Sequence, residues 1–214
     1  MPRQDFAHVR HWVFDLDNTL YPPQMRLFDQ IEPRMKTWIM NTAGVDAETA
    51  DTLRRRYWQR YGTTLGGLIA EHEIDPMAYL EDVHDISFDA LTPDPALAYQ
   101  IDLLPGRKIV YTNGSAPYAR SVLRARGLDG AMDAVYGVEH AGLQSKPNAM
   151  AFETVFELDG LNPHHAAMFE DDVRNLAVPY DLGMRTVHVA DAPEAKDFVD
   201  HHTENLSDFL KQLV

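Results

Sequence analysis

Residues 13–22 read Val13-Phe14-Asp15-Leu16-Asp17-Asn18-Thr19-Leu20-Tyr21-Pro22, an apolar run that stops at two aspartates one residue apart. The run predicts a buried strand, and side chains at positions i and i+2 of an extended chain point the same way. Asp15 and Asp17 should therefore face one point beyond the strand's carboxyl end, where open α/β sheets bind ligands. Two ionised carboxylates this close repel each other, and a divalent cation would relieve that repulsion. The same residues also fit an ordinary polar turn.

The composition describes a globular chain with room for a core domain and a smaller insertion. The 214 residues are 45% hydrophobic, include no cysteine and carry a formal net charge of −14. This charge argues against nucleic-acid binding, which needs a basic surface, but not against a small anionic substrate at a metal site. The lack of cysteine fits a reducing compartment, and we find neither a signal-type apolar segment nor a membrane-length run. We therefore expect a cytoplasmic protein with no membrane partner, and its oligomeric state stays open.

Strands and helices alternate on either side of a helical block. We expect strands over residues 9–15, 108–112, 134–136, 166–169 and 186–189, and helices over 117–126, 148–158, 175–182 and 205–214. Residues 24–92 hold apolar residues at helical spacing and no convincing strand. This order predicts an α/β fold, a Rossmann-like doubly wound parallel sheet formed by residues 1–20 and 96–214. An α-helical cap is inserted in it at residues 21–95.

Further polar groups stand at the ends of later strands or just before a helix. They are Thr112, Asn113 and Gly114 after the second strand, Lys146 before a helix, and Glu170, Asp171 and Asp172 after another strand. The hydroxyl and backbone N–H groups of the first set could hold an anion, although they also fit an ordinary helix cap. Three acids directly after a buried strand are poorly tolerated without a cation. Together with Asp15 and Asp17, these groups predict one site at the carboxyl edge of the sheet.

In this order the motifs resemble those of the haloacid dehalogenase-like superfamily. The matching residues are Asp15-Leu16-Asp17-Asn18-Thr19-Leu20, Thr112-Asn113-Gly114, Lys146-Pro147 and Glu170-Asp171-Asp172-Val173-Arg174-Asn175. The resemblance spans nearly the whole chain and implies a Rossmann-like core with a helical cap of the C1 type. It also implies a phosphomonoester hydrolase that uses Mg²⁺ and forms an aspartyl-phosphate intermediate.

The resemblance implies a role for each matching residue. Asp15 would be the nucleophile, Asp17 the general acid and base, and Lys146 would neutralise charge on Asp15 and the phosphoryl group. The phosphoryl oxygens would be held by Thr112, Asn113 and Gly114, with Asn18 and Tyr21 as further candidates. The metal ligands would be Asp15, Asp17 through its backbone carbonyl, Asp171 and, through water, Glu170. Asp172 stands where the family commonly has serine, and it could bind the metal or lie behind the ligands.

The cap resembles that of the pyrimidine 5′-nucleotidase subfamily. The matching segments are Leu20-Tyr21-Pro22, Tyr57-Trp58-Gln59-Arg60-Tyr61-Gly62-Thr63-Thr64-Leu65-Gly66-Gly67-Leu68 and Asp75-Pro76-Met77-Ala78-Tyr79. This resemblance implies a nucleoside monophosphate substrate such as UMP or CMP. Tyr57 or Tyr61 could stack on the base, while Thr63 and Thr64 could line a polar pocket. The two tyrosines equally fit the packed face of a cap helix.

Other functions fit parts of the same pattern. A phosphatase for phosphoglycolate or a sugar phosphate would have the same core and differ only in its cap. A receiver that merely accepts a phosphoryl group on Asp15 would also cluster acids and a lysine around Mg²⁺, but it would not need an enclosing cap. A catalytically idle interaction protein would have no need of all four motifs. The small-molecule hydrolase is therefore the leading hypothesis.

Overall fold

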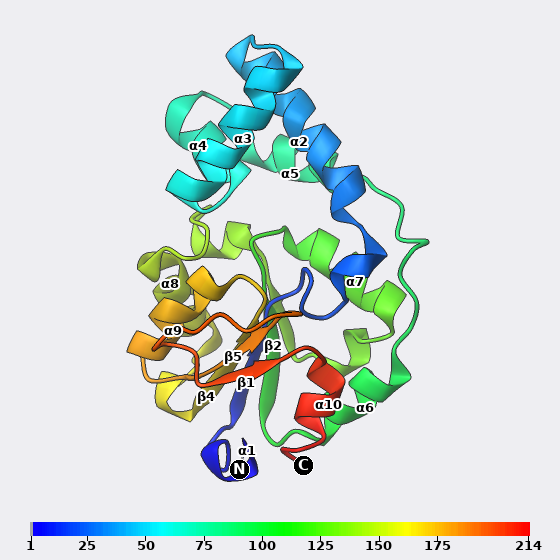
Figure 1. The fold of residues 1–214 in the computed structure, drawn as a ribbon, viewed down its shortest axis with the longest axis vertical. Helices are drawn as coiled ribbons and strands as arrows, with labels where there is room; N and C mark the ends of the chain where they lie inside the picture. Colours follow the sequence, from blue (N-terminus) through cyan, green and yellow to red (C-terminus); the bar gives the residue numbers. More distant parts are fainter. Residues whose placement is uncertain (1) are drawn as a thin grey trace.

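The computed structural model describes residues 2–214 and shows a parallel sheet with helices on both faces (Figure 1). The six strands lie in the order β3-β2-β1-β4-β5-β6, and every neighbouring pair is parallel. Their bounds are β1 (His11–Phe14), β2 (Arg107–Tyr111), β3 (Ala134–Tyr136), β4 (Ala166–Glu170), β5 (Arg185–Val189) and β6 (His201–Thr203). The predicted Rossmann-like doubly wound α/β fold is confirmed, and β1 lies between β2 and β4 at its centre.

The two faces of β1 are buried under different helices. Trp12 and Phe14 belong to the apolar cluster that includes α6 (Pro95–Leu103), α7 (Ala116–Arg126) and α10 (Leu206–Leu210). Val13 points to the other face, where it joins a second cluster with α8 (Ala149–Asp159) and α9 (Ala177–Asp181). Burial on both faces explains why β1 reads as a continuous apolar run.

Four helices between β1 and β2 form the cap. They are α2 (Phe28–Ala43), α3 (Ala47–Tyr61), α4 (Thr64–Glu71) and α5 (Pro76–Val83). Figure 1 shows them above the edge of the sheet where β1 ends. The side chains of Asp46 and Asp75 cap α3 and α5, respectively, by accepting hydrogen bonds from backbone N–H groups in the first turn of each helix. The predicted cap boundaries at residues 21 and 95 stay a prediction. The last cap helix, α5, ends at Val83, and residues 84–94 connect it to α6 of the core.

The remaining elements are short. They are α1 (Pro2–Asp5) and the 3₁₀ helices η1 (Pro23–Met25), η2 (Asp129–Ala131), η3 (Val138–Ala141), η4 (Pro163–His165) and η5 (Val173–Leu176). The helix expected over residues 175–182 is in fact η5 followed by α9. Proline lacks an N–H, and Pro179 is accommodated because it lies in the first turn of α9, where N–H groups have no partner within the helix.

The expected set of strands was incomplete. β6 follows β5 and adds a sixth strand at the sheet edge, with His201 opposite Val187 and Thr203 opposite Val189. Its sequence, His201-His202-Thr203, is polar and half-buried, so it carries no apolar run that could mark it. Pairing with β5, and not local propensity, makes this segment a strand.

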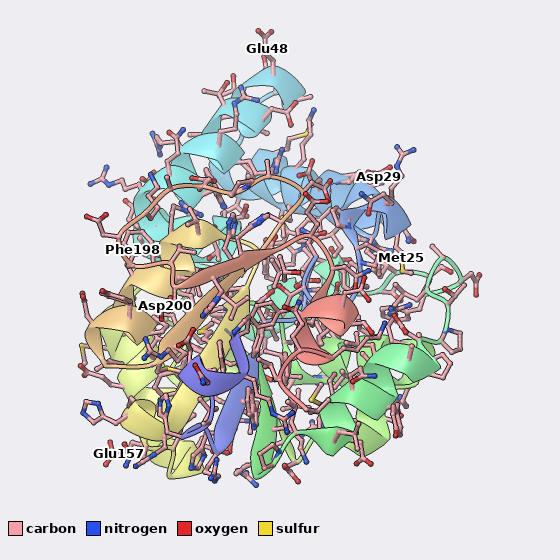
Figure 2. The ribbon with its side chains drawn as sticks, turned by 60° about the horizontal axis from the view of Figure 1, so that its bottom comes forward. Met25, Asp29, Glu48, Glu157, Phe198 and Asp200 are labelled. Atoms are coloured by element: carbon pink, nitrogen blue, oxygen red, sulfur yellow. The ribbon has the colours of Figure 1, made fainter. Side chains whose placement is uncertain are left out.

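Charged side chains project from both the cap and the core. Figure 2 shows Asp29 and Glu48 projecting outward from the cap and Glu157 from the core, and all three are exposed. Among residues 2–214, no helix is both long and apolar enough to cross a bilayer.

Gly67 permits close packing between two cap helices. A Cβ atom at this position of α4 would overlap the base of the Tyr57 ring on α3. We predict that Gly67→Ala lowers the free energy of unfolding by about 1–3 kcal/mol, although alanine is the better helix former. Thermal or urea unfolding measures this change. In Gly130→Ala a Cβ would meet no atom within 4 Å, so this control should stay close to the wild type. Equal stability of both variants would contradict the tight α3–α4 contact.

Candidate active site

Lys146 joins the ends of three neighbouring strands. Its Nζ donates to Asp15 Oδ1 at 2.7 Å, to Glu170 Oε2 at 2.6 Å and to the Tyr111 carbonyl at 3.0 Å. The register aligns Phe14 of β1 with Phe169 of β4, so Asp15 lies beside Glu170. The lysine side chain is 1% exposed, and two carboxylates compensate its buried charge.

Asn113 holds the segment that carries Lys146. The Lys146 N–H donates to Asn113 Oδ1 at 2.8 Å, and Asn113 Nδ2 donates to the Lys146 carbonyl at 3.1 Å. The cap approaches the same carbonyl, because a Cβ on Gly62 would lie 2.6 Å from it. The positive φ of 84° at Gly62 also favours glycine. The Asn113 side chain thus positions the Lys146 backbone, and the expected role of the Asn113 backbone N–H in binding phosphoryl oxygens stays a prediction.

Three carboxylates converge beside this lysine. Oxygen atoms of Asp15, Glu170 and Asp171 lie within 4.8 Å of one another. Asn18 Nδ2 donates to Asp171 Oδ2 at 3.2 Å and so fixes the third carboxylate. An all-oxygen donor set of this kind suits a hard divalent cation. The structure therefore brings together three of the metal-ligand candidates.

The cluster has more buried negative charge than Lys146 alone can balance. Burial and the neighbouring Glu170 carboxylate raise the pKa of Asp15, against the effect of Lys146. Burial, followed by Glu170 and Asp15, raises the pKa of Asp171 well above its usual range. Burial alone would lower the pKa of Lys146, but Asp15 and Glu170 outweigh it and raise that pKa. A cation on these oxygens would stabilise their ionised forms, so the residues present fit a metal ion.

Asp17 occupies a different environment from Asp15. Its Oδ1 accepts hydrogen bonds from the hydroxyl of Tyr21 at 2.5 Å and from that of Tyr118 at 2.7 Å. Burial and the Asp15 charge raise the pKa of Asp17 to about 6, while the tyrosine hydrogen bonds oppose this shift. Asp17 also lines the cavity described below. A carboxyl group with such a pKa can both give and take a proton near neutral pH.

The loop after β2 faces the same place. Thr112 is fully buried, and its Oγ1 accepts the N–H of Gly114 at 2.9 Å. That N–H is therefore engaged within the loop in this structure, and its expected role in holding an anion stays a prediction. Thr112, Asn113 and Gly114 all line the cavity, so the loop remains a candidate anion site.

A cavity of about 770 Å³ separates the carboxylate cluster from the cap. Its core wall includes Asp15, Asp17, Glu170 and Asp171, and its cap wall includes Thr63, Thr64, Trp58, Tyr79 and Arg55. Thr63 Oγ1 accepts the Gly66 N–H to cap α4 and lies 2.8 Å from Ser145 Oγ, which links cap and core. Thr63 and Thr64 are thus placed at the cavity, as their expected role requires.

Three candidates lie elsewhere or are engaged by protein groups. Asp172 accepts from Arg174 Nε at 3.0 Å and does not join the carboxylate cluster. Tyr57 is buried in the cap with its hydroxyl 2.9 Å from His72 Nε2, and the Tyr61 hydroxyl donates to Glu71 at 3.0 Å. Neither tyrosine is among the residues that line the cavity. Both tyrosines therefore fit the alternative prediction that they belong to the packed face of a cap helix, because their helical spacing places them against α4.

Sequence reasoning missed several residues of the site. The most prominent are Tyr118, His84, Trp58, Tyr79 and Asn175. Trp58 is 49% exposed at the cavity, and the Arg174 guanidinium lies 3.6 Å from the centre of its ring. The Tyr79 hydroxyl and Asn175 Oδ1 are buried and have no hydrogen-bond partner among residues 2–214. Trp58, Tyr79 and Asn175 belong to the matching segments, but nothing in their spacing indicates an orientation.

Comparisons with known proteins agree with this architecture. The family model for haloacid dehalogenase-like hydrolases matches residues 9–178. Phosphate metabolism protein 8 of Saccharomyces cerevisiae is 25% identical in an alignment 227 residues long, gaps included, that covers 95% of this chain and 70% of the yeast protein.

Solved structures show the same fold at low identity. A HAD phosphatase from Thermococcus onnurineus superposes with a TM-score of 0.64 at 18% identity, covering 96% of this chain and 98% of its own. The L-2-haloacid dehalogenase of Xanthobacter autotrophicus, with chloropropionic acid covalently bound, gives a TM-score of 0.60 at 17% identity with the same coverage. The fold is thus shared by phosphatases and dehalogenases. With the family model matching most of its length, the chain belongs to the haloacid dehalogenase-like hydrolases.

Proposed function

We propose that this protein is a Mg²⁺-dependent phosphomonoester hydrolase that works through an aspartyl-phosphate on Asp15. One observation carries this proposal: two aspartates at the same strand end have different surroundings. Asp15 contacts Lys146 and the carboxylate cluster, whereas Asp17 is held by Tyr21 and Tyr118. A buried nucleophile and a separate acid and base are what transfer of a phosphoryl group to water requires.

In the first step, a carboxylate oxygen of Asp15 attacks phosphorus and the bond to the ester oxygen breaks. Asp17 donates its proton to that departing oxygen, and the alcohol leaves. In the second step, water attacks phosphorus while Asp17 accepts its proton. The bond between phosphorus and Asp15 then breaks, inorganic phosphate departs and both aspartates return to their initial states.

Asp15, Glu170 and Asp171 would hold Mg²⁺, which would offset negative charge on the phosphoryl oxygens. Lys146 adds a fixed positive charge at the nucleophile, and Thr112 lines the same cavity. Dehalogenation is the less favoured activity, because attack on carbon to displace halide needs no proton donor such as Asp17. The held position of Asp17 therefore supports phosphate ester chemistry.

For the substrate, we propose a pyrimidine nucleoside monophosphate such as UMP or CMP. The cavity of about 770 Å³ is of a size that suits ligands larger than phosphoglycolate. Trp58, exposed in the cap wall, offers an aromatic surface to a base, a role that Tyr57 and Tyr61 are not placed to fill. A phosphatase for phosphoglycolate or a sugar phosphate remains the second candidate. The yeast relative's name refers to phosphate metabolism, in agreement with either substrate class.

A panel of phosphate esters tests the reaction and the substrate together. We predict kcat/KM values for UMP and CMP at least ~10-fold above those for phosphoglycolate and glucose 6-phosphate. Asp15→Asn should lower turnover by at least ~10³-fold, whereas Asp208→Asn, an exposed change on α10, should not. Preference for a small ester would remove the nucleotide assignment. A single stoichiometric phosphorylation without turnover would instead indicate a receiver.

Mg²⁺ binding can be measured without a substrate. We predict that Mg²⁺ at about 100 times its Kd stabilises the metal-free protein by about 2.7 kcal/mol in thermal unfolding. Asp171→Asn should abolish most of this stabilisation, because it removes one carboxylate from the cluster. Asp172→Asn should retain it, since the Asp172 carboxylate pairs with Arg174. Loss in the Asp172 variant with retention in the Asp171 variant would reverse the assignment of the ligand.

A further inference from the structure

Two buried tyrosine hydroxyls bind the same oxygen of Asp17. The Tyr21 and Tyr118 hydroxyls donate to Oδ1 at 2.5 and 2.7 Å and lie 3.4 Å from each other. The rings are 1% and 3% exposed, respectively, so water does not replace these donors readily. A carboxyl group anchored by one oxygen presents the other one in a fixed direction, and Asp17 lines the cavity beside Asp15.

The ring of Tyr118 is itself held from the segment that leaves the cap. His84, directly after α5, stacks on it with ring centres 4.1 Å apart and planes 9° from parallel. His84 Nδ1 lies 3.2 Å from Ser115 Oγ at the start of α7, and Phe88 packs against Tyr118 at 6.1 Å. Burial lowers the pKa of His84 to about 4, so the stacked ring is neutral near pH 7.

These contacts come from both connections between cap and core. Tyr21 lies where the chain leaves the core, and His84 and Phe88 lie where it returns from the cap. Tyr118 belongs to the core helix α7 and stands between them. Asp17 is therefore held, directly or through Tyr118, by residues from both connections and from the core.

We propose that Tyr21 and Tyr118 are positioning residues that orient the free oxygen of Asp17 toward the ester oxygen. His84 makes this orientation depend on how the cap is placed on the core. The inference rests on the proposed phosphatase function and assigns a specific positioning role to Tyr21, Tyr118 and His84. The two hydroxyls take no proton in the reaction. They fix the carboxyl group that donates one in the first step and accepts one in the second.

Leaving groups of different basicity separate this role from a merely structural one. p-Nitrophenolate departs without a proton, whereas the ribose oxygen of UMP needs one. A wrongly oriented Asp17 should therefore slow the hydrolysis of UMP more than that of p-nitrophenyl phosphate. For Tyr118→Phe and Tyr21→Phe, which remove only a hydroxyl, we expect kcat/KM for UMP to fall by ~10–100-fold. For p-nitrophenyl phosphate the fall should stay within ~3-fold, and the double variant should show the largest difference between the substrates.

Matched variants complete the test. Tyr136→Phe removes a hydroxyl that donates to another buried aspartate, Asp159, at 2.9 Å, and it should leave the ratio of the two kcat/KM values unchanged. His84→Ala should lower the ratio of kcat/KM for UMP to kcat/KM for p-nitrophenyl phosphate. His84→Phe keeps a stacking ring, so it should restore much of this ratio.

The outcomes are distinct. Equal losses on both substrates in Tyr118→Phe and Tyr21→Phe, or no loss, would overturn the positioning role while leaving the proposed function intact. Each of the two variants tests the role separately, so poor folding of one leaves the other decisive. Wild-type protein that hydrolyses neither ester in Mg²⁺ would overturn the proposed function, and the positioning role would fall with it.

Discussion

Lys146 carries the positive charge that lets Asp15 and Glu170 lie side by side, out of water, at the ends of β1 and β4. Its ammonium group is almost completely buried and touches both carboxylates and the Tyr111 carbonyl. A buried charge that loses its partner costs several kcal/mol, so each of these three groups depends on the others. The parallel register brings Asp15 and Glu170 together, and Asn113 holds the loop that delivers the lysine. The site is therefore formed jointly by the carboxyl ends of several strands and the loops that follow them, not by any single segment.

The surroundings of Asp15 and Asp17 differ, and this difference supports the different roles proposed for them. Asp15 faces the lysine and two further carboxylates, which suits a nucleophile next to a cation. Asp17, two residues away, meets two phenolic hydroxyls and carries a pKa of about 6, which suits proton transfer. Enzymes often separate acid and nucleophile in this way, by placing like groups in unlike environments. The fold alone does not make this distinction, since phosphatases and dehalogenases share it.

Much of this arrangement could be predicted from the sequence, because buried parallel strands leave apolar runs that end in polar groups. Asp15, Glu170 and Asp171 follow that pattern, and the structure brings them together with Lys146, which precedes a helix. β6 escaped prediction because pairing with β5 creates it. Tyr118 and His84 could not be predicted because the contact of Tyr118 with Asp17 and that of His84 with Tyr118 each span more than thirty positions of the chain. Asp172 was ambiguous for a related reason: its Arg174 partner is close in sequence, but nothing local shows which way its carboxylate turns.

In the proposed reaction, Asp15 takes the phosphoryl group. The most direct measurement is to acid-quench the Mg²⁺-loaded protein during turnover of UMP and to map the modified peptide by mass spectrometry. We expect one added phosphoryl group on Asp15, labile to hydroxylamine as an acyl phosphate is, and none in Asp15→Asn. A phosphoryl group on another residue, or turnover by Asp15→Asn at the wild-type rate, would contradict the proposed reaction.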